Sequence, residues 1–441
     1  MEGSDREMWT DRKCRRPHFA GWGLHCAGQY SASRPARSWQ AVAAAATSVL
    51  AASGVLAACG SSPKGTSAPT TPSYAAGTIK VSPAAGGPGT VVTLVGGAGH
   101  GCNLDHNWFG FSFVKADEAS GGPAVQMAAP LYGNGTWSAS FLVPAYLGSD
   151  HAGRPGLPAE PGRYEFKAPD CTGGKVGVVP FRVTAAAPEV ASAYVAIATT
   201  TDGGGYWLAQ ADGVVTAYGD ARSYGSRAPG ASARSAIVGM ARVSDGHGYW
   251  LLSRNGHVYH FGDAVGYGSL SPAVASQAPA VGIAESPDGK GYWILTADGH
   301  VYHFGDAQAL GQPGPSMAPY AAIMTRNGGG YIVTASSNAA TYLYPGGSIA
   351  GGGAGTALSA SLVGGAASPS GNGAWEAGID GGVITIGDTI NSFYGAVTAT
   401  IDASTDPVVA ISARPDGKGY WLLDRSGHVY ALGSAQIYSK A

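Results

Sequence analysis

The stretch Gly282–Gln312 reads GIAESPDGKGYWILTADGHVYHFGDAQALGQ, and it recurs through the second half of the chain. The other copies, some of them divergent, occupy 196–226, 239–269, 323–348, 365–396 and 410–441. They align on one position, occupied by Tyr206, Tyr249, Tyr292, Tyr331, Ala374 and Tyr420 at spacings of 43, 43, 39, 43 and 46 residues. A regular period of this length indicates a repeat architecture.

Each copy predicts four short antiparallel strands. In the quoted copy these are Val281–Ala284, Tyr292–Leu295, Val301–Phe304 and a short strand near Ala309–Leu310. Asp-Gly and Asn-Gly pairs between the strands tolerate positive φ and therefore suit tight hairpins. One copy is thus a small antiparallel sheet.

Sheets of four strands and about 43 residues predict a β-propeller over 194–441. Each sheet is too small to bury its own faces, so the sheets must stack around an axis. Six copies predict six blades; a seventh blade completed by residues near 186–194 is the alternative. The core between blades is predicted to contain Trp207, Trp250, Trp293, Trp375 and Trp421.

The repeat pattern GYWL…DGxVYxFGDAxxYGS resembles a repeat of secreted actinobacterial proteins. It is also similar to the repeats of regulator-of-chromosome-condensation-type propellers. Ser286–Trp293 resembles the Asp-box of sialidases, with its glycine one place out. These resemblances imply a shared propeller fold and no particular activity.

A first folded domain is predicted over 77–186. Short alternating segments such as Val91–Val95 and Gly135–Phe141, separated by Gly and Pro, predict a β-sandwich. The order IKVSPAAGGPGTVVTLVG, PGRYEF and FRVT resembles Ig-like domains of bacterial surface proteins. We therefore expect an all-β chain, with an Ig-like sandwich followed by a propeller.

Cys102 and Cys171 are the cysteines of this domain. In an exported protein such a pair is expected to form a disulfide, which would stabilise the domain by roughly 4 kcal/mol on the chain-entropy model. Two free thiols are the alternative. No metal site or cofactor is predicted.

Residues 1–58 are predicted to be an export signal. Arg34 and Arg37 precede an uncharged, Ala-rich run that ends in Leu56-Ala57-Ala58-Cys59. This ending resembles the bacterial lipobox, which implies cleavage before Cys59 and lipidation of its thiol. The alternative is a transmembrane helix over 41–58, at the short end for a span. The Ser/Thr/Pro/Gly-rich segment 59–76 is expected to be a linker.

Composition limits the possible partners. Charged residues make up 12% of the 441 residues and the formal net charge is −2, without a basic stripe. A nucleic-acid partner is therefore not expected. The expected location is the outer face of the cell membrane, with the membrane reached through the lipid on Cys59.

Candidate ligand-binding residues are few. His257, His300 and His428 open the third strand of three repeats, and Glu376 is an unusual carboxylate beside Trp375. The longer loops between successive repeats predict that the ligand binds at their end of the propeller. Asp220, Asp263, Asp306 and Asp388 recur after a glycine, which indicates turn capping.

No catalytic residues are predicted, because convincing paired carboxylates and a nucleophile elbow are missing. The function expected from the sequence is a cell-surface binding or adhesion module for a cell-wall glycan or a surface protein. The alternatives are an envelope scaffold and a propeller glycoside hydrolase or lyase.

Overall fold

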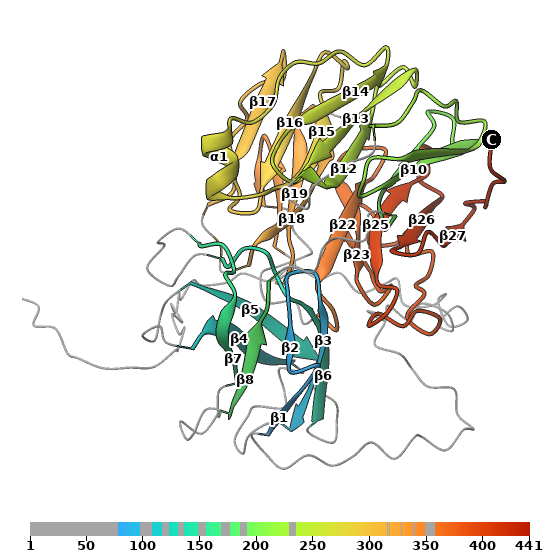
Figure 1. Ribbon diagram of the computed structural model, residues 1–441. Coiled ribbons are helices and arrows are strands. Elements are labelled where there is room, and N and C mark those ends of the chain that lie inside the picture. The colour runs from blue at the N-terminus through green and yellow to red at the C-terminus, as the bar shows by residue number, and fades with distance from the viewer. Residues whose placement is uncertain are drawn as a thin grey trace, which may run out of the picture. The chain divides into compact units, whose positions relative to one another are not determined.

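The fold is nearly all β (Figure 1). The computed structural model describes residues 78–97, 108–116, 123–130, 136–148, 156–168, 177–185, 192–228, 235–314, 316, 318–327, 329–337, 340–348 and 358–441. These residues belong to one compact unit, Ala57–Ala441. Among them no helix is long and apolar enough to span a membrane. The one α-helix of the described residues is short, α1 (Pro272–Gln277).

The first domain consists of two β-sheets with a common core. Its strands are β1 (Ile79–Ser82), β2 (Ala85–Gly86), β3 (Val91–Gly97), β4 (Trp108–Lys115), β5 (Ala124–Pro130), β6 (Thr136–Leu142), β7 (Gly162–Ala168) and β8 (Gly177–Val183). One sheet has the order β1-β3-β6 and the other the order β2-β8-β7-β4-β5. All neighbours are antiparallel except β2 and β8.

Aromatic side chains fill the space between these sheets. Phe113 lies 4.8 Å from Phe166 and 5.3 Å from Phe141, measured between ring centroids. All three rings are buried, since alternate residues of each strand point inward. The two-sheet core is the arrangement that the alternating segments predict.

The second domain is a ring of six sheets. The first strands of the blades are β9 (Tyr194–Thr199), β12 (Ile237–Arg242), β15 (Ala280–Glu285), β18 (Tyr320–Thr325), β22 (Leu362–Ala367) and β25 (Val408–Ala413). The second strands are β10 (Gly205–Gln210), β13 (Gly248–Ser253), β16 (Gly291–Thr296), β19 (Tyr331–Ala335), β23 (Gly373–Gly378) and β26 (Gly419–Asp424). The third strands are β11 (Val215–Gly219), β14 (Val258–Gly262), β17 (Val301–Gly305), β20 (Thr341–Tyr344), β24 (Val383–Gly387) and β27 (Val429–Gly433).

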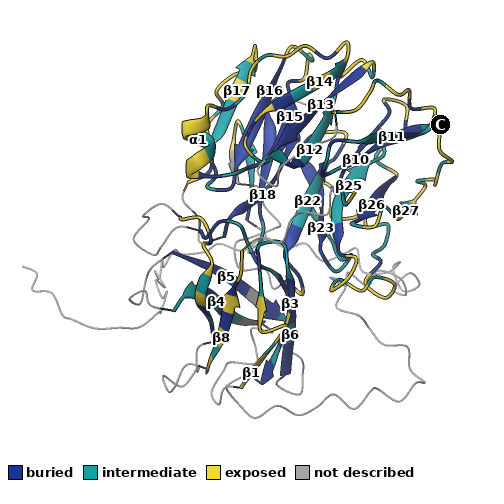
Figure 2. Cartoon of the chain, in the orientation of Figure 1, coloured by how far each residue is buried: buried dark blue, intermediate teal, exposed yellow. Residues whose placement is uncertain are grey.

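The first strands close the ring. Each packs beside the first strand of the next blade, and β25 of the sixth blade packs beside β9 of the first. The protein therefore contains a β-propeller of six blades, as six copies predict, and residues before Tyr194 add no seventh blade within the described part of the chain. The second strands are buried between neighbouring blades (Figure 2).

The prediction of a fourth strand in every blade was wrong. Within the described residues, five of the six sheets have three strands, and only blade four adds a short fourth strand, β21 (Gly347–Ser348). In blades one and two a serine side chain bonds the edge of the third strand instead: Ser226 Oγ accepts from Val215 N at 2.9 Å, and Ser269 Oγ accepts from Val258 N at 3.0 Å. In these two blades the tyrosine of the segment after the third strand donates to a glycine carbonyl of the next blade.

Two hydrogen bonds explain the recurring aromatic residues. The Trp of the second strand donates its indole N–H to a carbonyl of the irregular segment in its own blade, at 2.6 to 2.8 Å in five blades. The preceding Tyr donates to a glycine carbonyl of the previous blade, as Tyr292 does to Gly268 at 2.6 Å. The Tyr-Trp pair of the second strand therefore stabilises its own blade through the Trp and joins it to the previous blade through the Tyr.

The segment Tyr438–Ala441 closes the ring onto blade one. Tyr438 donates to the carbonyl of Gly203 at 2.6 Å. Gly219 N donates to Ser439 O at 2.9 Å and Ala441 N donates to Ala217 O at 3.0 Å, so this segment lengthens the sheet of blade one.

The sandwich contacts the propeller at the segment before β22 and at the end of β26. Ser140 exchanges backbone hydrogen bonds with Ser359 and Ser361 at 2.8 and 3.1 Å. The guanidinium of Arg425 donates to Gly89 O at 3.3 Å. Part of the propeller face that carries the longer loops is therefore in contact with the sandwich.

Several sequence predictions concern residues outside the described part of the chain. They are the export signal 1–58, lipidation of Cys59, the linker 59–76 and the Cys102–Cys171 disulfide. These remain predictions.

Candidate functional site

The turns between first and second strands meet the ends of the third strands at one end of the propeller. In blade three, Asp306 N donates to Lys290 O at 3.2 Å, and blade one repeats this contact from Asp220 to Gly204. The side chain of Asp306 also lies 3.4 Å from Ser286 Oγ, in the facing turn. The turn-supporting role predicted for these aspartates is confirmed in blade three.

A tyrosine fills the space between blades at four of the joints. It follows the third strand, lies against the next blade and donates its hydroxyl to a glycine carbonyl there. The pairs are Tyr224 with Gly246 at 3.0 Å, Tyr267 with Gly289 at 3.5 Å, Tyr394 with Gly417 at 2.7 Å and Tyr438 with Gly203 at 2.6 Å.

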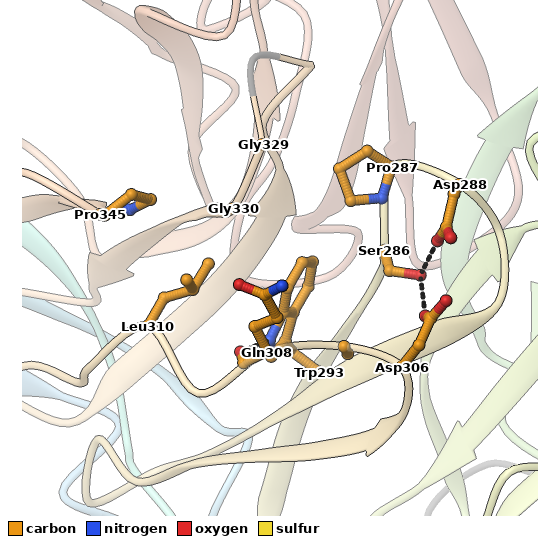
Figure 3. Close-up of a pocket in the computed structure, with 11 residues that line it drawn as sticks. Ser286, Pro287, Asp288, Trp293, Asp306, Gln308, Leu310, Gly329, Gly330 and Pro345 are labelled. Atoms are coloured by element: carbon orange, nitrogen blue, oxygen red, sulfur yellow. Dashed lines mark hydrogen bonds between the residues drawn. The ribbon is translucent and has the colours of Figure 1, made fainter.

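The joint between blades three and four lacks this tyrosine. Leu310 occupies the position of Tyr267, four residues after the aspartate that ends the third strand. On blade four, Pro345 occupies the position that is Gly305 in blade three, because Tyr344 pairs with Tyr331 as Phe304 pairs with Tyr292. A pocket of about 470 Å³ lies at this joint (Figure 3).

Apolar groups form most of the pocket wall. Leu310 and Pro345 lie on one side and Pro287 on the other, with Gly329 and Gly330 between the two prolines (Figure 3). Trp293 lies beneath Gln308, and its indole N–H donates to the backbone carbonyl of that residue at 2.8 Å.

Polar groups gather at one edge. Ser286 Oγ donates to Asp288 Oδ1 at 2.9 Å and lies 3.4 Å from Asp306 Oδ1, so the hydroxyl lies between two carboxylates (Figure 3). The exposed amide of Gln308 points into the pocket. A ligand would therefore meet mainly hydrogen-bond acceptors along this edge.

The two carboxylates titrate differently. Partial removal from water and the neighbouring Asp288 raise the pKa of Asp306. The hydroxyl of Ser286 and the amide N–H of Lys290 hold the pKa of Asp288 below its ordinary value. The two groups repel each other when both are ionised, so a ligand that donates hydrogen bonds or carries positive charge relieves this repulsion.

The three predicted histidines lie in separate blades and do not meet. All three are exposed, and each lies directly before the third strand of its blade. The Nδ1 of His300 lies 2.9 Å from Asp298 Oδ2, and that of His257 lies 3.4 Å from Ser269 Oγ. His428 lies beside Tyr430, with ring centroids 6.0 Å apart. Each is held by its own blade, and ligand binding by these residues stays a prediction.

Glu376 lies in the core between blades four and five, away from any open site. Its side chain is fully buried, and Oε1 accepts from Thr334 Oγ1 at 2.5 Å and Thr341 Oγ1 at 2.7 Å. Oε2 is buried without a partner. Burial raises the pKa of Glu376 to about 7, although the two threonine hydroxyls oppose the shift. This carboxyl is therefore buried in the core, out of reach of a ligand, and its burial disfavours the charged form.

A second cluster was not foreseen from the sequence. In blade two, ligand atoms of Asp245, His247 and Asp263 lie within 4.8 Å of one another, and all three residues are exposed. Exposed side chains commonly approach in this way, and their proximity alone does not indicate a metal ion.

The pocket lies at the opposite end of the strands from the loops that the sequence favoured. Its residues Pro287 and Asp288 belong to the turn between first and second strands, and the loops between repeats lie at the other end. The sequence does contain a signal: in the quoted copy Leu310 interrupts the YGS pattern that other copies keep. Its meaning depends on the next blade, which the pattern does not show.

Comparison with known proteins gives no family. No family model matches the chain, and no curated protein matches it. Among solved structures, one similar chain is a structural genomics protein of unknown function from Bacteroides thetaiotaomicron, with 13% identity, a TM-score of 0.40, and coverage of 81% of this chain and 98% of that chain. Another is the Cps50 (Swd1) β-propeller domain of Myceliophteria thermophila, with 11% identity, a TM-score of 0.36, and coverage of 66% and 94%.

Proposed function

We propose that this protein is an exported, lipid-anchored binding module whose propeller binds a glycan of the cell envelope or its surroundings. One observation carries the proposal: the pocket at the joint of blades three and four, where Leu310 replaces the tyrosine that fills other joints. Cleavage before Cys59 and an Ig-like type for the sandwich belong to the same proposal.

The form of the pocket favours binding of a small ring. Its volume of about 470 Å³ is within the range of roughly 300–1,000 Å³ that ligand pockets occupy. Apolar walls at Leu310, Pro287 and Pro345 face a polar edge at Ser286, and a pyranose has a similar division between apolar faces and polar rim. A protein partner would need a broader surface.

The carboxylate geometry favours binding over hydrolysis. Glycosidases hold their two carboxyl groups about 5 to 9.5 Å apart, leaving room for the scissile bond or for a water. Here both carboxyl groups lie beside one hydroxyl, because Ser286 Oγ donates to Asp288 Oδ1 at 2.9 Å and lies 3.4 Å from Asp306 Oδ1. That hydroxyl lies between the two carboxyl groups, where either mechanism requires the scissile bond or a water.

A glycan array and an envelope pull-down test the proposal. The protein is compared with the double variant Leu310→Tyr, Pro345→Gly, which gives this joint the residues of other joints. We expect a set of glycans to bind the protein and at least tenfold loss of binding in the variant, with the melting temperature showing that it is folded. Gln308→Ala is a second, milder variant with an expected loss of about threefold.

Two outcomes would contradict the proposal. One is glycan binding that both variants retain in full, because the ligand would then bind elsewhere. The other is a stoichiometric protein partner from the envelope with no glycan bound, which would identify the chain as a scaffold.

A further inference from the structure

We infer that the pocket selects sugars by charge, binding amino sugars with a free amine most tightly, neutral sugars less tightly and acidic sugars least. This inference rests on the proposed function and adds to it the class of glycan. The repeat provides an internal comparison. Blade one contains an equivalent pair of carboxylates, but there a tyrosine fills the joint.

The pocket edge offers more acceptors than donors. Both carboxylates face the pocket, and the one hydroxyl among them, on Ser286, already donates to Asp288 Oδ1. The ligand must therefore supply the protons of the remaining hydrogen bonds. Sugar hydroxyls can donate, and an ammonium group supplies three donors together with a positive charge.

The residues that line the pocket include two carboxylates and no basic side chain. Lys290 lowers the pKa of Asp306 through its charge, yet it lies outside the lining. Arg326 is the other nearby cation; it lies outside the lining, and its guanidinium donates to the carbonyl of Pro345 in blade four and to Gly371 O and Asn372 Oδ1 in blade five. An acidic sugar would therefore bring its carboxylate against Asp288 and Asp306 without a partner, at a cost that an amine avoids.

Blade one supplies the matched control. Thr200 Oγ1 donates to Asp202 Oδ1 at 2.8 Å, and partial removal from water together with the neighbouring Asp202 raises the pKa of Asp220, as happens to Asp306 beside Asp288 in blade three. At that joint, however, Tyr224 fills the space and donates to Gly246 O. Removing the charges of this pair alters the net charge equally without touching the pocket.

The experiment uses titration calorimetry at low salt and pH 7 on the full chain. The probes are tetrasaccharides of glucosamine, N-acetylglucosamine and galacturonic acid. We expect the glucosamine oligomer to bind at least tenfold more tightly than the galacturonate oligomer, with the N-acetylated oligomer between them. In the double variant Asp288→Asn, Asp306→Asn this preference should fall below twofold, and in Asp202→Asn, Asp220→Asn it should persist.

The results distinguish a failure of charge selection from a failure of glycan binding itself. Equal or tighter binding of galacturonate, or an amine preference that survives in the blade-three variant, overturns the charge selection while leaving glycan binding intact. A preference lost equally in the blade-one variant also overturns it, because the effect would then be general attraction. If none of the three oligomers binds and the glycan array is blank, both the inference and the proposed function fail.

Discussion

Glu376 makes the stability of the propeller depend on pH in a predictable direction. Other blades place Leu208, Leu251, Ile294 or Leu422 at this position of the second strand. Here a carboxyl is buried completely, and burial raises its pKa from an ordinary 4.5 to about 7. The group therefore keeps its proton in the folded protein at pH values where the unfolded chain has lost it.

The direction and the size of this pH effect follow from the linkage between proton binding and folding. Below pH 4.5 the carboxyl is protonated in both states and contributes no pH dependence. Between pH 4.5 and about 7 the free energy of unfolding falls as pH rises, because only the unfolded chain ionises. At 1.36 kcal/mol per pH unit, the full loss above pH 7 is about 3 kcal/mol.

The test compares the protein with Glu376→Gln by urea unfolding from pH 4 to pH 8.5. Glutamine keeps the shape and an oxygen that accepts from Thr334 and Thr341, but it cannot ionise. We expect similar stability near pH 4 and a variant that is more stable by about 3 kcal/mol at pH 8.5. Taking the difference between the two proteins cancels the contribution of Glu285, whose pKa burial also raises to about 7.

A matched control is Asp402→Asn, which alters an exposed carboxyl whose pKa the hydroxyl and N–H of Ser404 lower. Its pH dependence should not resemble that of Glu376→Gln. Parallel stability curves for the protein and Glu376→Gln over the whole range would show that the carboxyl ionises at its ordinary pKa, and the argument from burial would be wrong.

Three further predictions concern closure, anchoring and cross-linking. Tyr438→Phe removes the hydrogen bond to Gly203 O and should lower the free energy of unfolding by about 1 kcal/mol in urea titrations; unchanged stability would mean that the hydroxyl does not hold the ring. Cys59→Ala should release the protein from membranes or leave it unprocessed, and unchanged membrane fractionation would argue against the lipid. Non-reducing mass mapping should recover a Cys102–Cys171 peptide, whereas two alkylated thiols would contradict the disulfide.

Much of the fold was predictable because its causes are local. Alternating apolar residues and glycines such as Gly299, whose φ is +92°, define the strands and hairpins of a blade. The missing fourth strand was not predictable in the same way. Ser226 satisfies the edge of its sheet with a side chain, and Tyr224 leaves for the next blade, so the outcome depends on a neighbour far along the chain.

The candidate site also combines features that the sequence predicts with features that depend on a neighbouring blade. The sequence selected Glu376 as unusual, and only the packed structure shows that Thr334 and Thr341 of another blade enclose it. The pocket is a stronger case, because Leu310 interrupts the YGS pattern of its repeat, but the pattern does not show that Pro345 of the next blade faces it.

The amino-acid sequence by itself determined the repeating sheet and the number of copies, since turn residues and alternation act over a few positions. Only the tertiary structure decided that one unusual residue of the repeats, Leu310, lines a pocket and that another, Glu376, is buried in the core. The physical reason is that the space between blades belongs to two copies at once, so the effect of a residue such as Leu310 depends on what Pro345 presents across the joint.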